Sequence, residues 1–158
     1  GSWRYEIVAP GFKFNLTDIG AALGVVQLKK LPLFNKKRAQ IVGWYMKALA
    51  NKGFSFQKTK DYATHSHNLF PVLLPESLVS QRDAIIDRLK EHNIGANVYY
   101  IPLHFHPFYK KEYGWKLGDA PVTEKIFARL INLPLYPSLT KKEVMYVIEH
   151  FLQACQQS

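Results

Sequence analysis

The chain has 158 residues, 47% of them apolar and 14% aromatic, which favours one packed domain and excludes intrinsic disorder. Its net charge of +9 favours anionic partners, but no block of like charges is long enough for a nucleic-acid tail, and no nucleic-acid partner is expected. The single cysteine, Cys155, excludes an intrachain disulfide, and no apolar run could span a membrane. We therefore expect a cytoplasmic protein without a membrane partner.

The first residues resemble the start of a piece cut from a longer protein. Gly1 and Ser2 have the form of a scar left by a cleaved expression tag, and no initiating Met precedes residues 3–8. We therefore expect residues 1–2 to be such a scar, and catalytic residues to lie in chain upstream of this sequence.

An unusually apolar helix is predicted near the N-terminus. A loop over residues 11–18 leads into it, Asn15 or Thr17 can cap it, and it extends to about Lys30. A helix that is apolar on nearly every side does not lie on a water-exposed surface. We expect it to be buried where two large bodies meet or, in the alternative, in the core of this domain. The loop before it can offer backbone N–H groups and a positive dipole end to an anion.

Shorter elements follow this helix. Pro32 predicts a break or kink, and Pro71 favours an edge strand or a bulge. After the first helix, the sequence predicts a helix over 33–51 stopped by Gly53, a strand over 54–56, a loop over 58–66, a strand over 69–74 and a helix from Ser80 ended by residues 93–95. It then predicts a strand over 96–100, a turn over 102–106, a loop over 109–118, a helix over 121–130 and a strand over 131–135, with Val122, Ile126, Phe127 and Leu130 inward on that helix. The last helix is predicted to begin at a capping box, Thr140 to Glu143, and to have an apolar stripe of Val144, Val147, Ile148, Phe151 and Leu152.

This order predicts the α/β or α+β class: a long helical arm followed by a small, mostly antiparallel sheet covered by helices on one side. We expect residues 3–52 to form the loop and interdomain or interface helices, and residues 53–158 to form a C-terminal small domain.

Two His-x-His pairs are the first candidates for chemistry. His65 with His67, and His104 with His106, have the i, i+2 spacing that places side chains on one face of an extended chain. Four imidazoles could converge on a metal, but no cysteine or carboxylate stands at a ligand spacing, so no metal is expected and three of them are interpreted as hydrogen-bonding loop residues. His104 differs because two prolines brace its turn, and a rigid imidazole suits a substrate contact.

Four segments occur in the order found in one known family. They are the loop and helix over 11–31, the strand over 65–72, the Tyr-x-Ile-Pro-Leu-His turn within 97–109, and Leu-Pro-Leu-Tyr-Pro-Ser-Leu-Thr over 133–140. In these segments, from about residue 5 to residue 152, the chain resembles the pyridoxal-phosphate-dependent sugar-nucleotide aminotransferases of the DegT/DnrJ group.

The resemblance implies the C-terminal domain of the type I aminotransferase fold, in a homodimer with active sites at the subunit interface. Such enzymes transfer an amino group, usually from glutamate, to a keto group of a nucleotide-linked sugar. Their Schiff-base lysine lies in the large N-terminal domain. The resemblance therefore implies that this chain contains no catalytic residue and does not transaminate alone.

The resemblance also assigns roles to individual residues. Lys13 stands where the family commonly has Asn, and Asn15 where it has Arg; either could contact the cofactor phosphate of the neighbouring subunit. His104 matches the family's turn histidine and is expected to contact substrate, with Tyr100 as a second candidate. Two alternatives stay open: a non-enzymatic basic binding module, and a regulatory relative that has lost catalysis.

Overall fold

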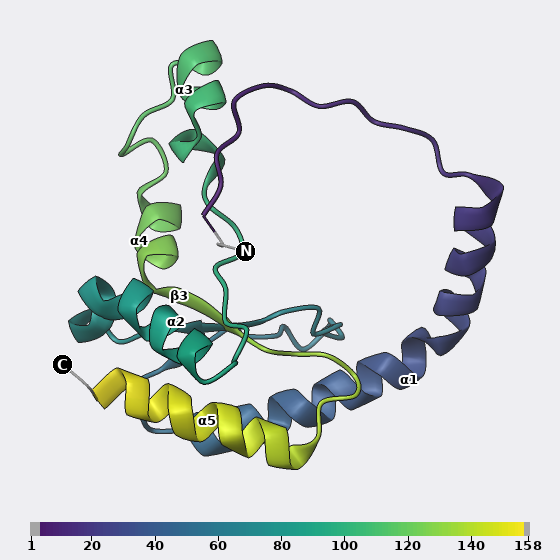
Figure 1. The fold of residues 1–158 in the computed structure, drawn as a ribbon, viewed down its shortest axis with the longest axis vertical. Helices are drawn as coiled ribbons and strands as arrows, with labels where there is room; N and C mark the ends of the chain where they lie inside the picture. Colours follow the sequence, from purple (N-terminus) through teal and green to yellow (C-terminus); the bar gives the residue numbers. More distant parts are fainter. Residues whose placement is uncertain (1–3, 157–158) are drawn as a thin grey trace.

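The computed structural model describes residues 4–156, in which a three-stranded antiparallel sheet is covered by helices and a long N-terminal arm leaves the domain (Figure 1). The predicted class is thereby confirmed. The strand order is β1-β2-β3, with Phe70 opposite Leu133 and Leu73 opposite Leu130 in the central pair. The strands are β1 (Ser55–Phe56), β2 (Phe70–Leu73) and β3 (Leu130–Leu133).

Helix α1 (Asp18–Leu49) is continuous, so the prediction of two separate helices is wrong. Thr17 caps it, because its Oγ1 accepts from the backbone N–H of Gly20 at 3.2 Å. Pro32 lies inside the helix, which changes direction along its length (Figure 1). A proline removes one backbone hydrogen bond, and this bends a helix when the turns on both sides stay helical. Gly53, with φ of 82°, lies in the turn that follows.

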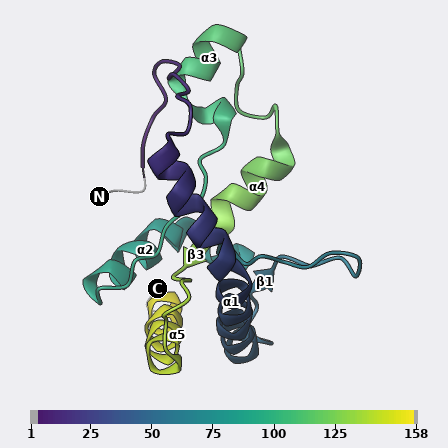
Figure 2. The ribbon, with the colours of Figure 1, turned by 90° about the vertical axis from the view of Figure 1, so that its right-hand side faces the viewer.

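The core lies between the sheet and three helices. The C-terminal part of α1 packs beside α5 (Lys141–Gln156), and α2 (Arg82–Glu91) packs against both α5 and β3, as Figures 1 and 2 show. Tyr45 is buried here, and its hydroxyl donates to the carbonyl of Pro134 at 3.0 Å. The predicted apolar stripe of the last helix is confirmed, with Val144, Val147, Ile148 and Phe151 buried.

The Thr140–Glu143 capping box is also confirmed. Glu143 Oε2 accepts from the backbone N–H of Thr140 at 2.7 Å, and Thr140 Oγ1 accepts from the backbone N–H of Glu143 at 3.3 Å. The two bonds satisfy N–H groups that a helix start otherwise leaves unpaired.

The predicted strand over 96–100 is only a single bridge between Asn97 and Asn132. The next hydrogen-bonded positions along β3 would be residue 134 on one side and Leu130 on the other. Pro134 has no N–H, and the N–H of Leu130 already bonds to Phe127 at the end of the preceding helix. The ladder therefore cannot extend in either direction.

Pro71 lies in the central strand of the sheet, not in the predicted edge strand. It is tolerated because β1 is short. The β1 register reaches only Val72 and Leu73, so at Pro71 the strand has a neighbour on one side alone and its missing N–H breaks no ladder.

Three smaller predictions also need correction. Helix α3 (Pro107–Tyr113) occupies the first part of the predicted loop over 109–118. It begins with a proline, and Gly114, in the left-handed conformation, caps its C-terminus. A 3₁₀ helix, η1 (Glu76–Gln81), precedes α2, so the helix predicted from Ser80 becomes regular only at Arg82. Helix α4 (Pro121–Arg129) is confirmed, but Val122 and Ile126 are exposed because α4 rises away from the sheet (Figure 1).

Within residues 4–156, no helix is long and apolar enough to cross a bilayer.

Candidate functional site

The predicted substrate residue His104 lies in a short 3₁₀ turn, η2 (Leu103–Phe105), between two prolines. Its side chain is buried, and Nε2 lies 2.8 Å from Oε1 of Glu124 on α4. A carboxylate only accepts, so Nε2 holds the proton and donates. In the neutral ring Nδ1 is then an acceptor, and no side chain or backbone group of residues 4–156 bonds to it.

Glu124 joins the histidine turn to the loop before α4. The same Oε1 accepts from the backbone N–H of Gly118 at 2.8 Å and from that of Ala120 at 3.4 Å. Burial acts to raise the pKa of Glu124, but the hydrogen bonds from Gly118, His104 and Ala120 outweigh it, and the net pKa lies below its usual value. The carboxylate thus stays ionised and holds His104 in one orientation.

A hollow of about 520 Å³ opens beside His104, lined also by Leu103, Trp115, Asp119 and Ala120. The Trp115 ring stacks on Tyr109 with ring centroids 5.4 Å apart and planes 10° from parallel. Sequence reasoning missed Trp115 and Glu124. The available signals were the Gly114 and Gly118 turns around the tryptophan, and a carboxylate one turn into a helix, where it can reach back to free N–H groups.

Tyr100, the second substrate candidate, is exposed and is not among the residues that line this hollow. Its ring lies 5.1 Å from that of Tyr99. The structure therefore places Tyr100 near His104 in the chain without directing both into one cavity.

The start of the described chain is tied to the same turn. Ile7 donates its N–H to Nδ1 of His106 at 3.2 Å and accepts from the N–H of Phe108 at 2.9 Å, while Tyr5 stacks on the His106 ring. An ion pair between Arg4 and Asp83 adds a second attachment. Residues 4–8 are thus anchored beside the candidate substrate site.

The loop that follows leaves the domain in a wide arc before it enters α1 (Figure 1). Lys13 and Asn15 lie on this loop, and both are exposed. Neither side chain bonds to another residue within 4–156. This chain alone therefore does not bring the two candidate cofactor residues together with His104 or Tyr100.

The apolar helix after this loop is exposed too. Ile19, Leu23 and Leu28 are 63–78% exposed, so the alternative that this helix belongs to the core of the domain is wrong. The described chain thus leaves an apolar patch uncovered. It comprises the large apolar side chains of the loop and of the N-terminal half of α1: Val8, Phe12, Phe14, Leu16, Ile19, Leu23, Val25, Val26, Leu28, Leu31 and Leu33.

The four imidazoles do not converge. His65 and His67 stack with centroids 4.3 Å apart, whereas His104 bonds to Glu124 and His106 to Ile7. Across residues 4–156, no group of three or more His, Cys, Asp or Glu side chains is arranged to hold a metal ion.

A long arm extends from a small antiparallel sheet covered by helices, and solved sugar aminotransferases share this fold. The chain belongs to the DegT/DnrJ/EryC1/StrS aminotransferase family, whose model matches residues 1–152.

Two curated relatives have similar identity. An uncharacterized protein of Methanocaldococcus jannaschii is 41% identical over 150 residues, and the spore coat polysaccharide biosynthesis protein SpsC of Bacillus subtilis is 40% identical over 152 residues. Each match covers 94% of this chain but 39% of the relative. The chain thus spans about two fifths of the length of the relatives it matches.

Solved structures show the same relation. The putative sugar aminotransferase Spr1654 of Streptococcus pneumoniae, in its PMP form, superposes with a TM-score of 0.85 at 32% identity, covering 98% of this chain and 39% of that one. That protein has also been solved in a PLP form.

Proposed function

We propose that this chain is the C-terminal part of a pyridoxal-phosphate-dependent aminotransferase that transfers an amino group to a keto group of a nucleotide-linked sugar. Glutamate is the proposed donor, and a cytoplasmic homodimer is the proposed working form. The observation that supports this most strongly is the family match over residues 1–152. The identity of 40% to a polysaccharide biosynthesis protein supports a sugar as the acceptor.

The residues present fit one end of the cofactor. Lys13 and Asn15 lie on an exposed loop, and their side chains have no partner within residues 4–156. There a cation and an amide can bind a phosphate on a neighbouring body. By contrast, every lysine of the chain is exposed, whereas a lysine that reacts with a carbonyl is typically desolvated to lower its pKa. We therefore propose that the reactive lysine lies in chain upstream.

When bound, pyridoxal phosphate supplies the aldehyde carbon that accepts and returns the amino group, and a ring that withdraws electrons from the reacting carbon. The role proposed for this chain is to bind and orient. His104 is fixed by Glu124 and offers Nδ1 as an acceptor for a sugar hydroxyl. Trp115, stacked on Tyr109, offers an aromatic face for a sugar ring or base and excludes water from that side.

The exposed arm supports the proposed homodimer. Apolar side chains on the loop and on the first half of α1 are left exposed by the part of the chain that the structure describes, and patches of this kind mark interaction sites. In the proposal, residues 3–52 contact the large domain and the second subunit, and residues 53–158 form the small domain.

The experiment is to express the whole gene product and supply glutamate with a panel of nucleotide-linked keto-sugars. We expect the purified whole protein to show visible absorbance from bound pyridoxal phosphate. With glutamate, it should form more than one equivalent of 2-oxoglutarate per active site only when a keto-sugar is present. The 158-residue chain alone should show neither. A whole protein that does not bind pyridoxal phosphate would refute the proposal, and one that binds it without turnover would indicate the regulatory alternative.

Single variants of the whole protein would separate the two cofactor candidates. We expect either Lys13→Ala or Asn15→Ala to weaken pyridoxal phosphate binding by about tenfold, the scale of one charge-assisted hydrogen bond. Lys60→Ala removes a lysine from the polar loop over 58–66 and serves as the matched control. If all three variants bind the cofactor equally well, the arm does not form the phosphate site.

A further inference from the structure

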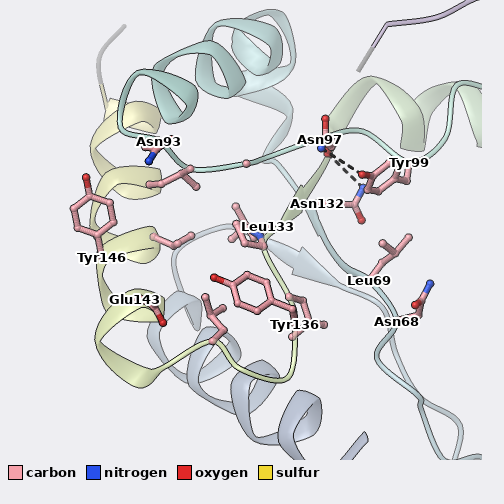
Figure 3. Close-up of a pocket in the computed structure, with 16 residues that line it drawn as sticks. Asn68, Leu69, Asn93, Asn97, Tyr99, Asn132, Leu133, Tyr136, Glu143 and Tyr146 are labelled. Atoms are coloured by element: carbon pink, nitrogen blue, oxygen red, sulfur yellow. Dashed lines mark hydrogen bonds between the residues drawn. The ribbon is translucent and has the colours of Figure 1, made fainter. Parts of the chain in front are cut away.

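A second cavity of about 470 Å³ lies between the first half of α5 and the segments around Asn97 and Asn132 (Figure 3). It shares no lining residue with the hollow beside His104. Its volume lies within the usual range of small-molecule sites.

One wall of this cavity contains a buried polar atom without a partner. Asn132 is 4% exposed, and its Oδ1 has no hydrogen bond within the described chain. Its orientation is fixed by the neighbouring strand: the Asn97 carbonyl accepts from the Asn132 backbone N–H at 2.7 Å and from Nδ2 at 3.4 Å. Since a carbonyl cannot donate, the amide nitrogen must face Asn97, and Oδ1 is the atom left unpaired. An unpaired buried acceptor is costly, so an occupant with a donor would relieve it.

A donor stands next to this acceptor. The hydroxyl of Tyr99, which also lines the cavity, accepts from Nδ2 of Asn97 at 3.3 Å. Figure 3 draws two of these hydrogen bonds as dashed lines, one from Asn97 to Tyr99 and one from Asn97 to Asn132. Because the Tyr99 oxygen accepts there, its own proton is free to donate. The site thus offers one acceptor and one donor side by side, which matches hydroxyl groups, since each of these both donates and accepts.

The charge of the lining excludes an anionic occupant. None of the described residues that line the cavity is basic, and Glu143 is its one ionisable carboxylate. The hydrogen bonds from Thr140 hold the pKa of Glu143 below its usual value, so the carboxylate is ionised and repels phosphate. A nucleotide, the substrate type proposed for the other site, does not fit here.

The remaining walls are apolar or aromatic. Leu133, Leu135 and Val147 contribute aliphatic surface. The half-exposed rings of Tyr136, before α5, and of Tyr146, on α5, complete the lining (Figure 3). The Tyr146 hydroxyl donates to the carbonyl of His92 at 3.3 Å, which fixes its ring. Flat aromatic faces beside amide groups suit a ring with C–H faces and a hydroxyl rim.

We propose that the cavity between α5 and the Asn97–Asn132 bridge binds a neutral, hydroxyl-rich ring such as a monosaccharide, with Asn132 Oδ1 and the Tyr99 hydroxyl as its polar anchors. This proposal does not rest on the proposed aminotransferase function, because it concerns a different cavity and an uncharged ligand.

The test is an NMR titration of the ¹⁵N-labelled 158-residue chain with D-glucose, N-acetyl-D-glucosamine and, separately, inorganic phosphate. We expect at least one sugar to shift the side-chain amide signals of Asn97 and Asn132 saturably, with a dissociation constant of about millimolar scale. Phosphate should leave these signals in place. Tyr99→Phe should weaken sugar binding about fivefold, because it removes one hydrogen bond. Asn132→Leu should weaken it by at least about tenfold, because the hydrogen bond that it removes is the better buried of the two.

Tyr62→Phe is the matched control, because it removes a hydroxyl from an exposed loop residue that does not line the cavity. Tyr99 is half-exposed, so we expect Tyr99→Phe to fold normally. This variant therefore tests the proposal even if Asn132→Leu folds poorly. The proposal is overturned if neither sugar shifts the two amides, if phosphate shifts them instead, or if Tyr99→Phe binds as tightly as Tyr62→Phe.

Discussion

The two halves of α1 have opposite environments although they belong to one helix. In the C-terminal half, Ile41, Val42, Tyr45 and Leu49 are buried against α5 and the sheet. In the N-terminal half, the large apolar side chains are exposed, and this part of the helix extends away from the sheet (Figure 1). Pro32 lies between them.

The comparison teaches that apolar composition alone does not say which body a helix packs against. An amphipathic pattern marks the half that belongs to this domain, because only one stripe of it meets the core. The half that is apolar all round is the half whose large side chains stay exposed among the described residues. If only the C-terminal half contributes to the core, the same substitution should have different effects on stability in the two halves.

The largest effect is expected from the same substitution made in each half. Leu49 is fully buried and Leu23 is 63% exposed. Leu49→Ala should lower the free energy of unfolding by about 2–5 kcal/mol, because it leaves a cavity in the core, while Leu23→Ala should change it by less than about 0.5 kcal/mol. Urea unfolding at low protein concentration measures both. Comparable losses would show that the arm is packed in solution.

The second effect is on association rather than folding. The exposed patch should drive the chain to self-associate as its concentration rises, and Leu23→Glu should weaken that association by at least about tenfold, because it places a charge in the apolar contact. Sedimentation velocity measures the association. Gln40→Glu adds the same charge in the C-terminal half and is the control. A wild-type chain that stays monomeric with an ordered arm would contradict the prediction.

A third, more local effect is expected at the bend. Pro32→Ala restores one helical hydrogen bond and should raise the opening free energy of the amides near residue 32 by about 1–3 kcal/mol. Global stability should change little, because the arm contributes no core contacts. Gly43→Ala, in the packed half with open space around it, is the control that should raise global stability. Hydrogen exchange measures the local opening free energy and the global unfolding free energy separately. If Pro32→Ala and Gly43→Ala raised the global unfolding free energy equally, the two halves of α1 would be coupled.

Most of the fold could be predicted because local signals agreed with tertiary contacts. The Thr140–Glu143 box, the stripe of α5 and the Pro121 start of α4 are each specified within a few residues. The failures depend on distant partners. The Asn97 segment looks like a strand until the missing N–H of Pro134 and the occupied N–H of Leu130 are known. Pro71 looks like an edge residue until the length of β1 is known.

The candidate site could be predicted only in part, for the same reason. The proline-braced turn identifies His104 by itself, but its partner Glu124 is 20 residues away and becomes visible only when α4 is placed. Lys13 and Asn15 are both exposed, and neither side chain bonds to another of the described residues. Nothing in the described residues could therefore select between them, and their assignment stays a prediction.

The smallest effect is expected at the start of α5, whose packing holds the buried half of α1 in place. Thr140→Ala removes a cap bond and should cost about 1 kcal/mol, while Thr64→Ala, in an exposed loop, should cost nothing measurable. The pKa of Glu143 is held below its ordinary value of 4.5, chiefly by the side-chain hydrogen bond from Thr140.

A carboxyl group with a lowered folded-state pKa stabilises the fold above its unfolded pKa, and this stabilisation is lost as the pH falls through the folded value. Wild type and Thr140→Ala should therefore differ most at neutral pH and converge as the pH falls below 4.5. Thermal unfolding at several pH values measures the difference. A gap that stays constant from pH 7 to below the unfolded pKa would show that the ionised Glu143 does not take part in the cap, and that α5 begins without help from the box.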